Sequence, residues 1–161
     1  MSDDIHLCDV RLLKEANDVC KEARASGNHP FGALLASPGG EVLIRAGNTY
    51  LADKGPGHAE MNVCRAAAKQ YSADYLETCT LYSPFEPCSM CSGGIYWTGI
   101  GTLVFGVTEQ RLAELTGDNS ENLTMSLPCR TILGAGQRTI EVRGPFPELE
   151  EEIIEIHSGF W

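Results

Sequence analysis

Near the start of the chain, apolar residues recur with a helical period. Between residues 8 and 25 most of the apolar positions are three residues apart: Val10, Leu13, Ala16, Val19, Cys20 and Ala23. This spacing places their side chains along one face of a helix. Gly27 follows, and glycine is typical of the position just after a helix. The pattern therefore predicts an amphipathic helix over residues 8–25.

Shorter apolar runs downstream have the composition of strands. Residues 31–36 and 41–46 flank the sequence SPGG, which favours a tight turn and therefore a β-hairpin. Further β-prone runs occur at residues 78–83, 102–107 and 139–143. Helix-favouring segments occur at residues 58–70, 88–97, 109–115 and 147–157, with a loop expected at residues 117–128.

After the hairpin, strands and helices alternate along the chain. Such alternation requires crossover connections, which place helices on both faces of a largely parallel sheet. The hairpin supplies an antiparallel edge. The sequence thus predicts an α/β fold: a three-layer αβα sandwich around a mixed, mostly parallel five-stranded sheet. A length of 161 residues suits a single domain covering residues 1–161.

Charge and hydropathy limit the kinds of molecule that the protein is expected to bind. Lys and Arg number 12 against 22 Asp and Glu, a net charge of -10, so large nucleic acids are not expected as partners. No run approaches the roughly 20 apolar residues of a membrane span, and the first residues, MSDD, do not resemble a signal peptide. We expect a cytoplasmic protein that does not associate with membranes.

Two short motifs carry the chemistry. The sequence HAE at residues 58–60 is followed by PCSMC at residues 87–91. The imidazole of His58 and the thiolates of Cys88 and Cys91 would fill three tetrahedral positions on Zn²⁺, one ion per subunit, and leave the fourth open. A purely structural zinc site would use four protein ligands. The motifs therefore predict a catalytic zinc centre.

Glu60 is the expected catalytic residue of this centre. It lies two residues after His58 at the start of a helix, where it could transfer protons without binding the metal. A CxxC alone could instead be a redox pair, but the order of the two motifs argues against that. The remaining cysteines lack partners at ligand spacing and are expected to be reduced core residues: Cys8, Cys20, Cys64, Cys79 and Cys129.

The segments PFGALL, HAEMNVCRAA and EPCSMCSGGIYWTGI resemble the cytidine and deoxycytidylate deaminase superfamily. They are most similar to bacterial guanine deaminases, with cytosine deaminases and tRNA adenosine deaminases as near relatives. The resemblance implies a cytidine deaminase-like fold, a homodimer formed through the motif helices, and zinc-dependent hydrolytic deamination that releases ammonia.

The resemblance leaves several substrates open. A free nucleobase or nucleoside is expected, and of these a purine such as guanine. Cytosine or cytidine is the first alternative. A tRNA adenosine is the second, although the acidic residues between Glu148 and Glu155 disfavour it. A zinc-stabilised scaffold without catalysis belongs to a different class, and the presence of Glu60 argues against it.

By the same resemblance, a few further residues would contact the substrate. Asn48 would hydrogen-bond the ring, although it could equally be a turn residue after Gly47. Ala59 would present its backbone N–H, and Phe31 would form a wall of the pocket unless it belongs to the core. His29, just before the first strand, is a weaker candidate. The terminal Trp161 would cover the pocket or pack on the core.

Overall fold

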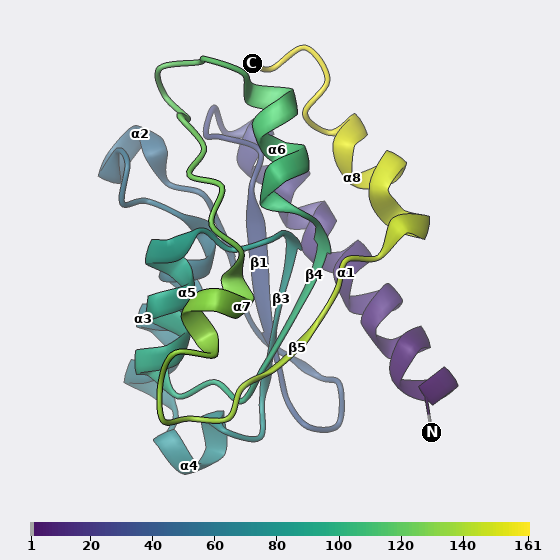
Figure 1. Ribbon diagram of the computed structural model, residues 1–161, viewed down its shortest axis with the longest axis vertical. Helices are drawn as coiled ribbons and strands as arrows, with labels where there is room; N and C mark the ends of the chain where they lie inside the picture. Colours follow the sequence, from purple (N-terminus) through teal and green to yellow (C-terminus); the bar gives the residue numbers. More distant parts are fainter. Residues whose placement is uncertain (1) are drawn as a thin grey trace.

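The computed structural model describes residues 2–161 and contains one mixed sheet (Figure 1). Its strands are β1 (Gly32–Ala36), β2 (Val42–Gly47), β3 (Thr80–Phe85), β4 (Thr102–Val107) and β5 (Glu141–Arg143), in the order β2-β1-β3-β4-β5. β1 is antiparallel to both of its neighbours, whereas β3, β4 and β5 are parallel to one another. Four of the five strands therefore point the same way, and the predicted mixed sheet is confirmed.

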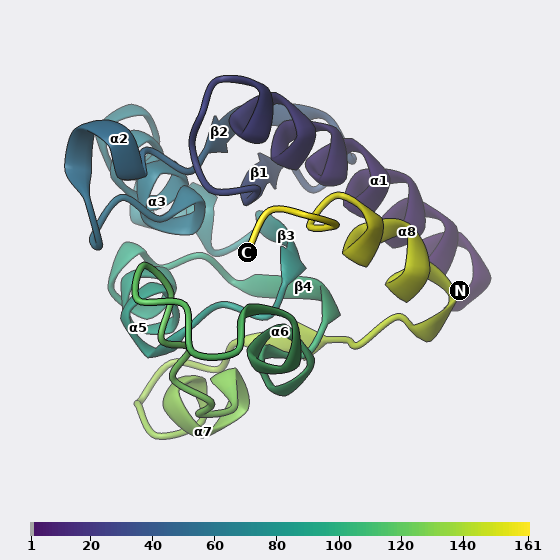
Figure 2. The ribbon, with the colours of Figure 1, turned by 90° about the horizontal axis from the view of Figure 1, so that it is seen from above.

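Helices cover both faces of this sheet. They are α1 (Ser2–Ala25), α2 (Tyr50–Asp53), α3 (Ala59–Gln70), α4 (Ala73–Leu76), α5 (Ser89–Thr98), α6 (Glu109–Thr116), α7 (Cys129–Leu133) and α8 (Glu150–Glu155), with a 3₁₀ helix, η1, at Pro147–Leu149. Figure 2 shows α1 and α8 on one side of the sheet and α3 and α5 on the other. The predicted three-layer sandwich is confirmed.

Each face of the sheet has its own core, because successive side chains of a strand point to opposite faces. Leu34 of β1 packs with Leu12 and other apolar residues of α1. Leu35, the next residue, belongs to the opposite core, which contains Val63 of α3 and Ile95 of α5. All five residues of β1 are buried, as expected for a strand that helices cover on both faces.

The structure differs from the predicted elements mainly at their ends. α1 begins at Ser2, well before residue 8, and acidic Asp3 and Asp4 lie in its first turn, where the helix dipole favours negative charge. The short helices α2, α4 and α7 were not predicted, because four or five residues do not produce a recognisable period. The acidic segment forms η1 followed by α8.

Two expectations from composition can be compared directly with the structure. All seven cysteines lie within residues 2–161 as free thiols; Cys20, Cys64, Cys79 and Cys129 are buried, as expected for core residues, whereas Cys8 is half-buried. No helix among these described residues is long and apolar enough to cross a membrane.

Candidate active site

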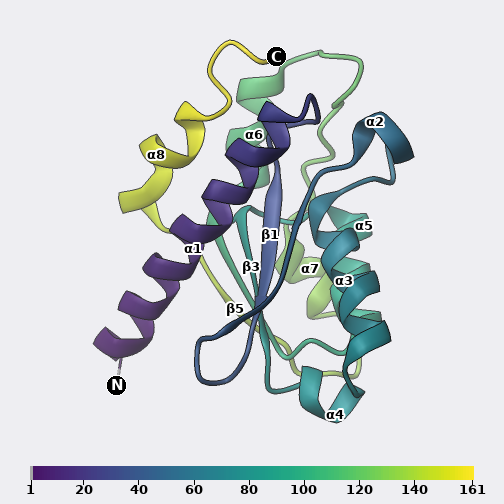
Figure 3. The ribbon, with the colours of Figure 1, turned by 180° about the vertical axis from the view of Figure 1, so that it is seen from behind.

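Polar residues gather at one edge of the sheet. Asn48 directly follows β2, Glu86 directly follows β3, and Glu109 comes two residues after β4. These strands point the same way, so their carboxyl ends meet at this edge, and in α/β sheets such an edge is where ligands bind. β1 runs in the opposite direction, which brings Phe31, the residue before it, to the same place. Figure 3 shows α2, α6 and the C-terminus gathered at this end of the molecule.

The metal-binding motifs lie where α3 and α5 begin. His58 is the N-cap residue of α3, and Cys88 is the N-cap residue of α5, with Cys91 in the first turn of that helix. The two helices pack side by side, and the side chain of Met61 occupies the space where a Cβ on Gly94 would lie. This close approach brings the two motifs together, and the positive ends of both helix dipoles point toward the thiols.

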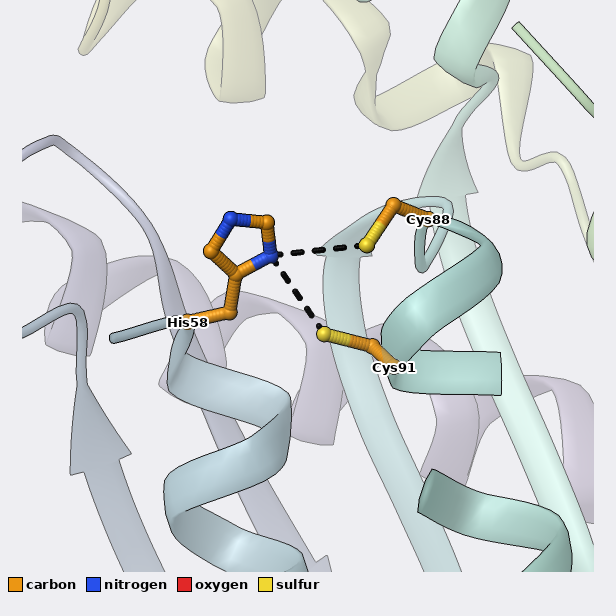
Figure 4. A group of neighbouring side chains, drawn as sticks. All are labelled: His58, Cys88 and Cys91. Carbon is orange, nitrogen blue, oxygen red and sulfur yellow. Dashed lines mark hydrogen bonds between the residues drawn. The ribbon is translucent and has the colours of Figure 1, made fainter. Parts of the chain in front are cut away.

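The three predicted ligands form a compact cluster (Figure 4). His58 Nδ1 lies 3.4 Å from Cys88 Sγ and 3.4 Å from Cys91 Sγ. All three ligand atoms lie within 4.8 Å of one another. Tetrahedral zinc, with its usual bond lengths to nitrogen and sulfur, would separate such atoms by about 3.6 Å. The donor set and its spacing therefore fit a zinc ion with three protein ligands.

The protonation of the two thiols is also suited to a metal. A hydrogen bond from the Cys91 thiol, together with one from His58, lowers the pKa of Cys88 to about 4. Since Cys91 is the donor of that bond and is buried, its own pKa is raised. Metals bind the thiolate form, so zinc would displace the proton that this pair shares.

Glu60 lies in the first turn of α3, close to the metal ligands. Its side chain is largely buried and lines the same cavity as His58 and Cys88. Burial raises the pKa of Glu60 to about 7, and the neighbouring His58 partly opposes this change. A carboxyl in this position can reach both the open side of the metal cluster and a ligand in the cavity.

The cavity beside the cluster has a volume of about 260 Å³. Pockets for drug-sized molecules usually have volumes of about 300–1,000 Å³, so this one suits a smaller ligand. His29, Phe31 and Asn48 line it, as expected from the sequence. Phe31 also packs edge to face on Phe85, with 5.8 Å between ring centroids, and so is both a wall of the cavity and a part of the core.

Asn48 makes the turn interaction that the sequence left open, and it also lines the cavity. Its Oδ1 accepts a hydrogen bond of 2.8 Å from the backbone N–H of Tyr50, which is the turn interaction. Because Oδ1 faces that donor, Nδ2 is left to donate to a ligand in the cavity. The structure therefore commits the acceptor of Asn48 largely to the turn.

His29 holds two walls of the cavity together. Its ring stacks on Tyr50, with 4.2 Å between the centroids, and its Nε2 lies 2.8 Å from Glu121 Oε1. Glu121 belongs to the loop at residues 117–128, and the segment 121–125 of this loop forms the outer wall of the cavity. His29 therefore connects the start of the sheet with the outer loop.

Trp161 and Ala59 lie next to the cavity but not among its lining residues. Trp161 packs edge to face on His29, with 5.1 Å between the centroids, and donates a hydrogen bond of 2.9 Å to His157 Nδ1. Burial lowers the pKa of His157 to about 4, so that its ring is neutral at pH 7 and can accept this bond. Ala59 is fully buried as the first residue of α3.

Several cavity residues were not predicted from the sequence. They include Tyr50, Glu86, Glu109 and the loop residues Glu121, Asn122, Leu123, Thr124 and Met125. Glu86 and Glu109 could have been found, because both follow apolar strands at the carboxyl edge of a predicted sheet. The loop carries no comparable signal, since nothing in its composition indicates that it folds over the motif helices.

The comparison with known families agrees with this geometry. Residues 7–107 match the cytidine and deoxycytidylate deaminase zinc-binding region. A probable cytosine deaminase of Schizosaccharomyces pombe is 39% identical over 153 residues, which cover 95% of this chain and 92% of that protein. The chain belongs to the cytidine and deoxycytidylate deaminase family, and His58, Cys88 and Cys91 form its zinc site. It is therefore a zinc-dependent deaminase, a hydrolase that acts on carbon–nitrogen bonds.

Two further relatives act on different substrates. A tRNA-specific adenosine deaminase of Bacillus subtilis is 36% identical over 104 residues, which cover 64% of each chain. The structure of a guanine deaminase from Bacillus subtilis superposes with a TM-score of 0.60 at 26% identity, covering 94% of both chains. The comparisons thus establish the family and its fold, but they do not by themselves identify the substrate.

Proposed function

We propose that the protein deaminates cytosine, a free nucleobase, by hydrolysis to uracil and ammonia. The observation that carries this proposal is the similarity to a probable cytosine deaminase over 95% of this chain. That similarity includes the last third of the chain, which supplies the outer loop of the cavity and the C-terminal tail. It favours a pyrimidine over the purine that we expected from the motif segments.

The motif segments do not distinguish these substrates, because the chain is similar to cytosine, guanine and tRNA adenosine deaminases alike. The cavity gives independent support for a small base. Its volume of about 260 Å³ lies below the usual range for drug-sized ligands. The free Nδ2 of Asn48 suits a ring that carries a carbonyl, and the face of Phe31 suits a flat ring.

The metal and the residues of the chain would have separate roles in the reaction. Zinc, when bound, supplies a water nucleophile at neutral pH by lowering the pKa of that water to about 7. We assign the proton transfers to Glu60, which lies between the metal cluster and the cavity. It would pass the first proton of the attacking water to the ring nitrogen, and then the second proton, from the new hydroxyl group, to the leaving amine, which departs as ammonia. The backbone N–H of Ala59 and the Asn48 amide would orient the ring.

Ammonia release tests the proposal. The zinc-loaded protein is incubated with cytosine, cytidine, guanine and adenine, and its zinc content is measured in parallel. We expect the highest kcat/KM with cytosine. A preference for guanine would restore the purine alternative, and release from no base despite bound zinc would contradict the proposed function.

A tRNA substrate is the alternative that charge disfavours most. The net charge is -10, and the outer wall of the cavity includes Glu121 beside the buried Glu86 and Glu109. Phosphate groups gain affinity from lysine and arginine, not from carboxylates. The similarity to the tRNA-specific relative is also confined to 64% of this chain.

We propose that the C-terminal tail closes the cavity through its contact with His29. Arg24 holds the tail with hydrogen bonds to the carbonyl oxygens of Ile156 and Ser158, 2.6 and 2.8 Å long. Removal of Phe160 and Trp161 should raise KM for the base roughly tenfold, because one wall loses its support, and should leave zinc content unchanged. Steady-state kinetics and metal analysis provide the test. Unchanged kinetics would assign the tail to packing alone.

We propose that the protein forms a homodimer through the motif helix α5. Trp97 on this helix is 80% exposed, and it borders a surface hollow with Tyr96 and Ile132. Exposed aromatic residues are frequent anchors of interfaces. Trp97→Lys should weaken the dimer roughly 30-fold or more, measured by analytical ultracentrifugation. Leu7→Lys is the matched control, since Leu7 is 65% exposed on the opposite layer. A monomeric wild type would disprove the proposal.

A further inference from the structure

Four acidic side chains line the cavity: Glu60, Glu86, Glu109 and Glu121. Glu60 has its assigned role in proton transfer, and Glu121 lies against His29. Glu86 uses both of its oxygens within the protein. It accepts hydrogen bonds from the backbone N–H of Glu109, at 3.0 Å, and of Cys129, at 2.7 Å. Glu86 therefore fixes the starts of α6 and α7 beside the motif loop.

Glu109 differs from the other three acids. Its residue is only 3% exposed, and its Oε2 is buried without any hydrogen-bond partner among residues 2–161. A buried polar group without a partner destabilises the fold. Its backbone N–H is held by Glu86, so the position of the residue at the wall of the cavity is fixed. The fold thus keeps one unpaired carboxyl oxygen beside the place where the substrate would bind.

We propose that Glu109 is a specificity-determining residue that hydrogen-bonds the ring of the bound base. The inference rests on the proposed function and extends it, because it states what the base must offer: a ring N–H, an amino group or an acceptor that complements a carboxyl. A base without a complementary group would leave Glu109 unpaired in a closed pocket. Sites of this kind reject such analogues strongly.

The electrostatic surroundings indicate the protonation state in which Glu109 would hydrogen-bond the base. Burial, together with the negative groups at Cys88, Glu86 and Glu60, raises the pKa of Glu109 to about 9. A raised pKa favours the protonated carboxyl, which offers one donor and one acceptor. Glutamine has nearly the same shape and the same pair of groups, so Glu109→Gln should preserve the interaction and Glu109→Ala should remove it.

Kinetics with several bases provide the main experiment. Glu109→Ala should lower kcat/KM for cytosine roughly 10- to 100-fold and change its ratio to that for guanine or adenine, whereas Glu109→Gln should stay within a few-fold of wild type. Glu114→Ala is the matched control, because Glu114 lies exposed on the same helix. Zinc content should be equal in all variants. An unchanged ratio between bases in Glu109→Ala would overturn the proposal.

Stability and binding separate this proposal from simpler explanations. A structural residue would lower the Tm when it is replaced, whereas Glu109→Gln should keep or raise the Tm, because it removes an unpartnered acid.

Binding of cytosine is measured by calorimetry in the zinc-loaded Glu60→Gln protein, which separates affinity from turnover. Glu109→Ala in that background should weaken binding 10- to 100-fold. If wild type releases no ammonia, the proposed function fails, and the binding difference still decides the role of Glu109. Equal binding of cytosine with and without Glu109→Ala, or no binding of any base, would reject that role.

Discussion

Glu60→Gln is expected to lower kcat for ammonia release by about 10²- to 10⁴-fold, the range that general acid–base catalysis usually contributes, with zinc retained at one ion per chain. Glutamine fills the same space but cannot take a proton from water or deliver one to the leaving amine. The ligands His58, Cys88 and Cys91 are unaltered by the substitution. Stopped-time ammonia assays and metal analysis of the same sample measure the two quantities.

The pattern of effects identifies the role of Glu60. A residue that only positions the base would change KM more than kcat, whereas a proton-transfer residue changes kcat and kcat/KM together. Glu114→Gln provides a control of the same chemistry at an exposed site on α6. Rates like those of wild type in Glu60→Gln would contradict the assignment, and a loss of zinc in that variant would show that the carboxyl supports the metal site instead.

The metal site was the part of the molecule that could be predicted best. His58, Cys88 and Cys91 were expected together, and the structure brings them together. This succeeded because metal coordination restricts both residue type and spacing, and because each motif lies at the start of a helix whose composition is clear. α3 and α5 begin one residue after the predicted starts, since His58 and Cys88 are cap residues.

The long elements were predictable for a similar reason, whereas their arrangement was less so. β4 has the predicted bounds of Thr102–Val107, because its apolar run is uninterrupted. The hairpin was expected at the edge of the sheet, and its strand β2 does form an edge, but β1 lies between β2 and β3. Pairing of β1 with β3 joins segments far apart in the chain, and periodicity carries no information about such partners.

The lining of the cavity was the least predictable part of the site, since its residues come together only in the tertiary structure. Glu109 and Glu121 come from α6 and the following loop, and they meet Asn48 and His29 at the carboxyl edge of the sheet. None of them stands in a motif with fixed spacing. The purine expectation came from the segments PFGALL, HAEMNVCRAA and EPCSMCSGGIYWTGI, which supply the metal ligands but only part of the cavity wall.

Replacement of a metal ligand is the second change expected to have a very large effect. Cys91→Ala leaves His58 and Cys88 as the remaining protein ligands, and should weaken zinc affinity roughly 10²- to 10³-fold, because zinc binding of about 10–16 kcal/mol is spread over a few ligands. At limiting zinc, metal content and ammonia release should fall together. Cys8→Ser, a half-buried cysteine outside the site, should keep both.

Thermal unfolding gives a readout of the same change that does not depend on activity. A ligand that binds only the folded state raises its stability by an amount that grows with the logarithm of one plus the ratio of ligand concentration to Kd, so added zinc should raise the Tm of the metal-free wild type by several degrees. In Cys91→Ala this rise should be largely lost at the same zinc concentration, because His58 Nδ1 and Cys88 Sγ alone bind the ion weakly. An equal rise of Tm in wild type and variant, with equal zinc content, would show that the ion binds elsewhere and would remove the basis for assigning the reaction to this cluster.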